Sequence, residues 1–185
     1  GLTAVFGVMY LLLGLTVWGI LYPRHDRVTV NMWTGGALLL GGGILLVVWR
    51  DYLPTWLSFG VANIMMFGGY AARVAALRRD LRLVTKPWVV MLVWLAISLG
   101  YVGTLQAPTM SLRMLYGFLF HALGAFAVAV YAWRLAGQHR SLSARMLGGM
   151  YYAFSVALLL RLIALSTYQE AGAHPLAPTW DSVLV

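Results

Sequence analysis

Three polar side chains that could bind a ligand lie deep within long apolar runs of this chain: Asn63, His121 and Arg161. Each is seven or eight residues from the nearest boundary of its run, which is roughly 10–12 Å along a helix at 1.5 Å per residue. An amide, an imidazole and a guanidinium are therefore expected at one depth. Polar groups within hydrocarbon are costly and usually face the interior of a helix bundle. This spacing predicts that the three side chains converge on one site.

Aromatic residues recur on the helical faces that carry these three polar residues. Residues three, four or seven apart share one face of an α-helix, which places four aromatic side chains beside the polar ones: Phe59, Phe67, Phe118 and Tyr168. Glycine and alanine near His121 leave space beside its ring. The pattern predicts a cavity with aromatic walls. In it, Arg161 would hold an anionic or carbonyl group of a small ligand, and the other two polar residues would supply hydrogen bonds.

Each of the three polar residues also has a purely structural interpretation. Asn63 could join two helices by a hydrogen bond, a contribution that averages about 0.6 kcal/mol in membranes. His121 could be a hydrogen-bonded core histidine. Arg161 could extend to the interface or pair with an acidic residue there, and three carboxylates are candidates: Asp51, Glu170 and Asp181. The sequence leaves both interpretations open.

The remaining polar residues form no recognisable catalytic or metal-binding pattern. The other histidines, His25, His139 and His174, fall in predicted loops. A single histidine could ligate haem iron, and methionines could supply soft ligands for copper, but no second ligand converges with His121 at one level. The chain has no cysteine, no phosphate-binding loop and no hydrolase motif. We therefore expect no cofactor and no catalysis by this segment.

The composition indicates that these residues lie in a lipid bilayer. Of 185 residues, 62% are hydrophobic and 10% are charged, whereas soluble domains are about 45–50% apolar and about 25% charged. Continuous apolar runs of about 18 residues or more recur, the length that crosses roughly 30 Å of hydrocarbon. Such runs argue against the alternating strands of a membrane barrel. The sequence predicts an all-α, polytopic transmembrane bundle, whose net charge of +8 lies in loops rather than on a nucleic-acid-binding face.

Prolines and polar loops divide the chain into six complete helices and the start of a seventh. The hairpin from Trp33 to Tyr70 organises the others, because Pro54 ends one membrane-length helix and Thr55 can cap the next. The tail beyond Glu170 contains two prolines and then a short apolar segment, which begins a seventh helix near residue 178. The expected helices, within one domain over residues 1–185, span about 2–22, 32–50, 56–79, 88–105, 112–136 and 145–169.

The distribution of basic residues predicts how the bundle is oriented. Ten of the 13 Lys and Arg residues, Arg73 among them, follow the first, third and fifth helices, whereas Arg50 and Arg113 lie on the other side. Since cytoplasmic loops are enriched in Lys and Arg, the N-terminus is expected outside, in the inner membrane of a bacterium. The predicted ligand would then enter from the periplasm or the outer leaflet.

The chain resembles a known type of membrane region. The features that carry the resemblance are Trp33, Gly35-Gly36, Gly41, Arg50, Leu53-Pro54 with Trp56-Leu57-Ser58, Ala62-Asn63, Gly68, the basic pair Arg78-Arg79, and Arg161. In spacing and hydropathy they resemble the seven-helix membrane sensor region found ahead of GGDEF diguanylate cyclase domains in bacteria, and sometimes ahead of histidine kinases. The resemblance covers nearly the whole chain.

The resemblance implies a sensory input domain. Its seventh helix would drive a cytoplasmic signalling domain, a diguanylate cyclase that makes cyclic di-GMP, and the parent protein would act as a homodimer. Besides membrane lipid, the expected partners are a small ligand and that effector domain, although no GGDEF or kinase residues occur in these 185 residues. Two alternatives remain. One is a transporter or permease subunit, against which no inverted repeat or broken helix is visible. The other is a structural module that anchors or dimerises its partners.

Overall fold

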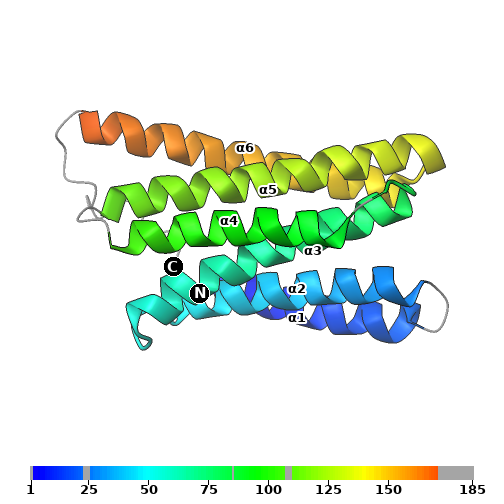
Figure 1. The fold of residues 1–185 in the computed structure, drawn as a ribbon, viewed down its shortest axis with the longest axis horizontal. Coiled ribbons are helices and arrows are strands. Elements are labelled where there is room, and N and C mark those ends of the chain that lie inside the picture. Colours follow the sequence, from blue (N-terminus) through cyan, green and yellow to red (C-terminus); the bar gives the residue numbers. More distant parts are fainter. Residues whose placement is uncertain (1, 23–25, 85, 107–109, 171–185) are drawn as a thin grey trace.

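The protein is a bundle of six long helices that run alternately in opposite directions (Figure 1). The computed structural model describes residues 2–22, 26–84, 86–106 and 110–170, and no strand occurs among them. The helices are α1 Leu2–Leu21, α2 Arg27–Val48, α3 Ala62–Asp80, α4 Pro87–Leu105, α5 Met110–His139 and α6 Leu142–Glu170. Six helical segments are long and apolar enough to cross a membrane. The expected all-helical architecture is confirmed, whereas the seventh helix predicted near residue 178 lies outside the described residues.

A side-chain cap starts α2 earlier than the sequence predicts. The helix begins at Arg27 rather than near Met32, because Asp26 caps it. The Oδ2 atom of Asp26 accepts hydrogen bonds from the backbone N–H of Thr29 at 3.2 Å and from its hydroxyl at 2.8 Å. Such a cap satisfies backbone donors that have no partner within the helix.

The turn between α5 and α6 is shorter than expected, because α5 ends later and α6 begins earlier, at Leu142. Gly137 does not end α5, which continues to His139. The chain then reverses at Arg140, whose φ of 49° is left-handed. At the start of α6, the hydroxyl oxygen of Ser141 accepts a hydrogen bond from the backbone N–H of Ala144 at 3.3 Å. A left-handed residue after a helix is a common way to end it.

A π-helical turn, η1, spans Trp56–Val61 and leads directly into α3. It starts after Pro54, whose carbonyl oxygen accepts from the backbone N–H groups of Leu57 and Ser58 at 2.9 and 3.0 Å. Together η1 and α3 form one continuous segment of membrane-spanning length, Trp56–Asp80. Short π-helical turns within α-helices are frequent at functional sites, and this one immediately precedes Asn63.

Glycines bring α1, α2 and α3 into close backbone contact. A Cβ atom at Gly41 in α2 would lie 2.8 Å from the carbonyl oxygen of Gly7 in α1. One at Gly36 in α2 would lie 3.0 Å from the carbonyl oxygen of Gly69 in α3. Small residues permit this approach where apolar burial gives no driving force between helices in lipid. The glycines therefore serve helix packing at these crossings.

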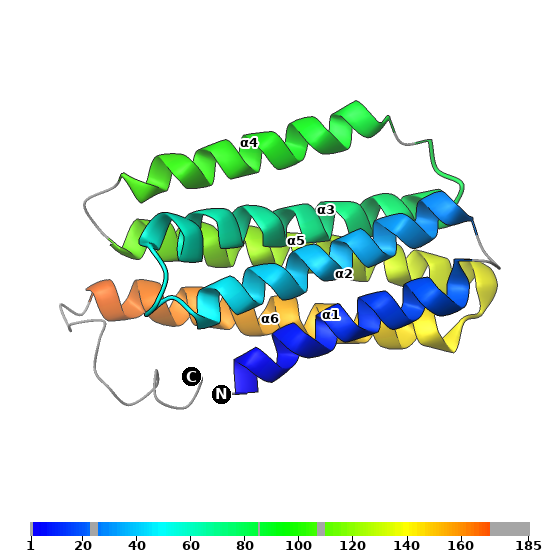
Figure 2. The same ribbon diagram turned by 90° about the horizontal axis from the view of Figure 1, so that it is seen from below.

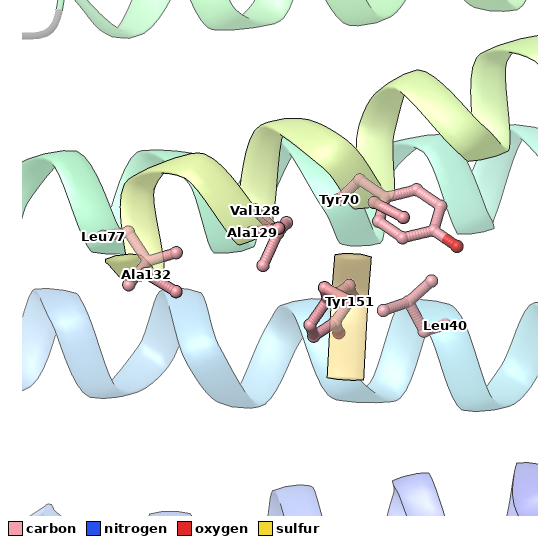
Figure 3. Packing of buried hydrophobic residues seen from close by; sticks show 8 residues of the cluster. Leu40, Tyr70, Leu77, Val128, Ala129, Ala132 and Tyr151 are labelled. Atoms are coloured by element: carbon pink, nitrogen blue, oxygen red, sulfur yellow. The ribbon is translucent and has the colours of Figure 1, made fainter. Parts of the chain in front are cut away.

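The core lies between α2, α3, α5 and α6. Figure 3 shows that one residue of α2, two of α3, several of α5 and one of α6 meet there: Leu40, Tyr70, Leu77, Val128, Ala129, Ala132 and Tyr151. Ala125, Ala129 and Ala132 of α5 have no exposed surface, and their small size lets α5 approach its neighbours closely. The rings of Tyr70 and Tyr151 meet edge to face, with centroids 6.4 Å apart.

Helix α4 is less embedded in the bundle than its neighbours. Its ribbon stands apart from those of α3 and α5 in Figure 2. Its buried residues are Ser98, Tyr101 and Thr104, whereas most of its large apolar side chains are exposed. Side-chain hydrogen bonds connect it to α3 and α5. The indole N–H of Trp94 donates to the carbonyl oxygen of Ile64 at 3.1 Å, and the hydroxyl of Tyr116 donates to that of Ile97 at 2.9 Å.

The two ends of the bundle differ in charge. One end gathers the C-terminal ends of α1, α3 and α5 and the N-terminal ends of α2, α4 and α6, and we name it the basic end. It carries Arg27, Arg78, Arg79, Arg82, Lys86, Arg134, Arg140 and Arg145. The opposite end carries Arg50 and Arg113 among the described residues.

Candidate ligand-binding site

Three helices are joined inside the bundle by a hydrogen-bonded group that we name the polar triad: Asn63 of α3, Tyr101 of α4 and His121 of α5. The side-chain amide of Asn63 donates to the hydroxyl oxygen of Tyr101 at 2.9 Å and to the carbonyl oxygen of Phe59 at 2.7 Å. The Nε2 atom of His121 lies 2.7 Å from Oδ1 of Asn63. Asn63 is 8% exposed and Tyr101 is 2% exposed, whereas His121 is half-buried.

The hydrogen bonds of the triad determine the state of the histidine. Because Oδ1 of Asn63 is an acceptor, Nε2 of His121 must carry the hydrogen. The other ring nitrogen, Nδ1, is buried and has no hydrogen-bond partner in the described part of the chain. A neutral ring protonated at Nε2 leaves only a lone pair at Nδ1, which costs less to bury than an unpaired N–H or a charge. The site therefore favours neutral imidazole.

Aromatic rings surround the histidine of the triad. The ring centroid of His121 lies 4.8 Å from that of Phe67 and 5.8 Å from that of Tyr70. Phe67 also meets Tyr101 edge to face at 5.7 Å. Three of the residues expected to share a site, Asn63, Phe67 and His121, are thus in one connected group.

The other expected site residues are distributed differently. The guanidinium carbon of Arg161 lies 5.0 Å from the ring centre of Phe118, one helical turn before His121 on α5. The ring of Phe59 lies under Arg113, at 5.8 Å. Both contacts are cation–π pairs. Tyr168 belongs to α6, but its side chain lies outside the described part of the structure.

Two clefts flank α4. We name the one between α3, α4 and α5 the α4–α5 cleft; its volume is about 550 Å³ and its walls include Phe67, Tyr70, Trp94, Phe120 and Ala127. The one between α2, α3 and α4 is the α2–α4 cleft, with a volume of about 610 Å³. Both are mostly apolar, and ligand pockets typically hold about 300–1,000 Å³. Neither of these two clefts is lined by Asn63, His121 or Arg161.

The α4–α5 cleft is nevertheless in contact with the polar triad through its walls. Phe67 and Tyr70 line the cleft, and the rings of both contact the imidazole of His121. A molecule bound in the cleft that displaced the ring of Phe67 or Tyr70 would therefore change its contact with the imidazole of His121. Arg78 and Lys86 lie at the basic end of this cleft.

Sequence reasoning missed a buried arginine. Arg73 was expected near a basic loop, but it is 5% exposed and lies among three aromatic rings, those of Tyr10, Trp33 and Tyr151, at 5.2–5.5 Å. Its Nη1 donates to the hydroxyl of Tyr151, and its Nε is buried without a hydrogen-bond partner in the described residues. The available signal was its place three residues after Tyr70 within an Ala-rich helical run, one turn before the basic residues that end α3.

Metal binding finds no support in the described residues, where no three His, Cys, Asp or Glu side chains gather closely enough to hold an ion. Comparison of the chain with family models, curated proteins and solved structures gives no match.

Proposed function

We propose that the chain is a membrane-embedded sensory input domain, in which a small ligand occupies the α4–α5 cleft and changes the packing of α4. The observation that carries this proposal is the contact of two cleft walls, Phe67 and Tyr70, with His121 of the polar triad. A ligand shifts an equilibrium only by binding two arrangements with unequal affinity. The triad supplies a connection between α4 and the rest of the bundle that differs between two such arrangements.

The hydrogen bonds of Asn63 explain why α4 can move at modest cost. If α4 shifts outward, the bond from Asn63 to Tyr101 breaks, but the amide keeps its bonds to Phe59 and His121. Interhelical side-chain bonds in membranes contribute about 0.6 kcal/mol on average. A guest that packs closely against the cleft walls can offset a loss of that size through van der Waals contacts. In this proposal, ligand binding breaks or strengthens the hydrogen bond from Asn63 to Tyr101 that connects α4 to α3.

The expected route of the ligand changes with this geometry. The sequence predicted that the ligand enters from the periplasm or the outer leaflet and meets Arg161. The α4–α5 cleft instead lies between helices and has Arg78 and Lys86 at its basic end. An apolar or amphipathic ligand would enter it laterally, from the bilayer. Arg161 and Phe118 then hold α5 and α6 together beside the triad.

The direction of signalling in this proposal follows from charge and resemblance. The enrichment of Lys and Arg at the basic end supports placing that end in the cytoplasm and the N-terminus outside, in a bacterial inner membrane. The likeness of the segment around Trp33 to Asn63 to sensor regions supports a cytoplasmic effector after the last helix, a diguanylate cyclase. Two cyclase domains must meet to act, so the parent protein would be a homodimer.

Helix movement can be measured without interference because the chain has no cysteine. Spin labels at Leu99 of α4 and Leu160 of α6, both exposed, report the separation of these helices in lipid nanodiscs. Ala127→Phe places a ring in the α4–α5 cleft, and we expect it to shift the label distances. Ala153→Phe adds the same ring to an exposed position of α6 and serves as the matched control. Equal distances in all three proteins would contradict the proposal.

One observation favours the structural alternative, a membrane anchor or dimerisation module. Asn63 and His121 hydrogen-bond to each other, as polar side chains do when they only join helices. Reading the gene beyond Val185 separates the functions: a seventh helix followed by a signalling domain supports the sensor. Further membrane helices would favour a transporter subunit, and the absence of any further domain would favour the anchor.

A further inference from the structure

The flank of α4 that faces α2 carries a second cleft, distinct from the proposed ligand site. The floor of the α2–α4 cleft consists of small residues of α3, namely Gly68, Ala71, Ala72 and Ala75. Leu39 of α2 and Met91 and Trp94 of α4 form its sides. Small floor residues between larger side walls leave an elongated apolar space along the helices, which matches a hydrocarbon chain rather than a water-soluble solute.

The basic end of this cleft carries positive charge. Arg79 and Arg82 both line it, but the Nε of Arg79 forms an ion pair with Oδ2 of Asp26 at 2.6 Å. Arg82 is exposed and forms no ion pair within the described part of the chain. Its φ of 54° is left-handed. The chain thus keeps an arginine at the cleft mouth in a conformation that glycine or asparagine would adopt more easily.

The N-terminus of α4 adds to this charge. Pro87 is the first residue of α4 and lines the cleft. The N-terminus of a helix carries a partial positive charge. An apolar slot thus ends at the Arg82 guanidinium and a helix N-terminus, at the basic end of the bundle.

We propose that the α2–α4 cleft binds an anionic phospholipid of the leaflet at the basic end, with an acyl chain along Gly68–Ala75 and the headgroup phosphate on Arg82. The acyl chain accounts for the apolar walls, and the phosphate supplies the negative partner that Arg82 lacks among the described residues. Guanidinium groups bind phosphate oxygens through paired N–H donors. Basic pockets between membrane helices bind anionic headgroups in the same way.

The charge requirement can be tested on the intact chain purified in detergent. Native mass spectrometry measures retention of palmitoyl-oleoyl phosphatidylglycerol and, in parallel, of the zwitterionic phosphatidylcholine with the same chains. We expect phosphatidylglycerol to be retained preferentially, and Arg82→Asn to weaken its binding about fivefold. Asparagine tolerates the left-handed conformation, so the substitution removes charge without straining the turn.

Arg140→Asn is the matched control. Arg140 is also exposed, left-handed and located at the basic end, but it lines neither cleft. We expect its replacement to leave phosphatidylglycerol binding unchanged. The proposal is overturned if Arg82→Asn binds as wild type, if Arg140→Asn weakens binding equally, or if both lipids bind equally well.

A second pair of variants distinguishes this site from the proposed ligand site. Ala72→Leu fills only the α2–α4 cleft, and we expect it to lower phosphatidylglycerol retention; Ala127→Phe fills only the α4–α5 cleft and should not. If Ala127→Phe alone lowers retention, the lipid occupies the other cleft and the inference fails. If helix α4 does not move in the spin-label experiment while Arg82→Asn still loses lipid, the sensor proposal fails and the lipid site stands.

Discussion

The Nε2 atom of His121 lies 2.7 Å from Oδ1 of Asn63, which joins α5 to α3 within the bundle. Both N–H donors of the Asn63 amide are used, because its nitrogen donates to Tyr101 and Phe59, and its oxygen accepts from the histidine. One side chain thus connects three helices. This explains how a single asparagine near the π-helical turn can couple a movement of α4 to the packing of α5.

Replacing Asn63 by Leu should destabilise the bundle. The substitution leaves His121 and the hydroxyl of Tyr101 buried without their partner, and we expect a loss of about 1–2 kcal/mol in the free energy of unfolding. The measurement is unfolding in mixed micelles, followed by circular dichroism. The same substitution should cost less in a His121→Leu background, because the two residues share one hydrogen bond. Additive effects of the two substitutions would argue against this coupling.

The hydroxyl of Tyr151, which accepts a hydrogen bond from Arg73, should stabilise the protein only while the guanidinium is present. Tyr151→Phe removes the acceptor of a buried donor, so we expect a destabilisation of about 1–3 kcal/mol. Once Arg73→Met has removed the charge, Tyr151→Phe should have little effect. Tyr152→Phe, at the exposed neighbouring tyrosine, is the control. A large effect of Tyr151→Phe in both backgrounds would mean that the tyrosine acts through packing alone.

Two glycines of α2, Gly43 and Gly35, should respond differently to replacement by alanine. A Cβ atom at Gly43 would lie 2.7 Å from the carbonyl oxygen of Ala62, whereas one at Gly35 meets nothing within 4 Å. Gly43→Ala should force α2 and α3 apart and cost about 1–3 kcal/mol. Gly35→Ala should be neutral or stabilise by up to about 1 kcal/mol, since alanine favours helix. Thermal unfolding of the two purified variants measures both, and a neutral Gly43→Ala would rule out the tight crossing.

The ion pair at the basic end should make stability depend on pH. The hydrogen bond from Arg79 lowers the pKa of Asp26 to about 2, from about 3.9 in an unfolded chain. A lowered folded-state pKa stabilises the protein above the unfolded pKa. That contribution is lost as the pH falls from about 4 to about 2.

The predicted result is a loss of stability in this pH range that Asp26→Asn abolishes. Asparagine still caps α2, so the variant isolates the charge. Asp51→Asn, at the exposed hinge of the opposite end, should retain the pH dependence of the wild type. Melting temperatures measured at several pH values between about 5 and 2 compare the three proteins. If Asp26→Asn keeps the full acid sensitivity, the ion pair does not contribute.

The helices could be predicted because their signal is local. Apolar runs of membrane length and the prolines that end them are readable residue by residue, so α1 and α4 lie within one residue of their expected bounds. The early start of α2 depends on the Asp26 cap. The residues that follow the cap are mostly polar and show no helical periodicity, so the sequence did not indicate a helix there. The extension of α5 past Gly137 was missed because glycine only weakly disfavours helix, and packing elsewhere along a long helix can outweigh that preference.

Equal depth of Asn63, His121 and Arg161 also follows from counting residues, but direction around the helix axis does not. The direction in which each side chain leaves its helix determines that His121 contacts Asn63, whereas Arg161 contacts the ring of Phe118. It also turned Arg73 into the bundle, away from the basic loop to which its sequence position assigned it.

By itself, the sequence determined a multi-helix membrane protein with a polar layer and one basic end, because hydropathy and charge act through each segment's own contact with lipid and water. Tertiary structure alone decided which polar groups meet, that α4 stands apart, and where clefts remain beside it. Those features depend on how pairs of helices approach and rotate against one another, and contacts between residues far apart in the chain set that geometry.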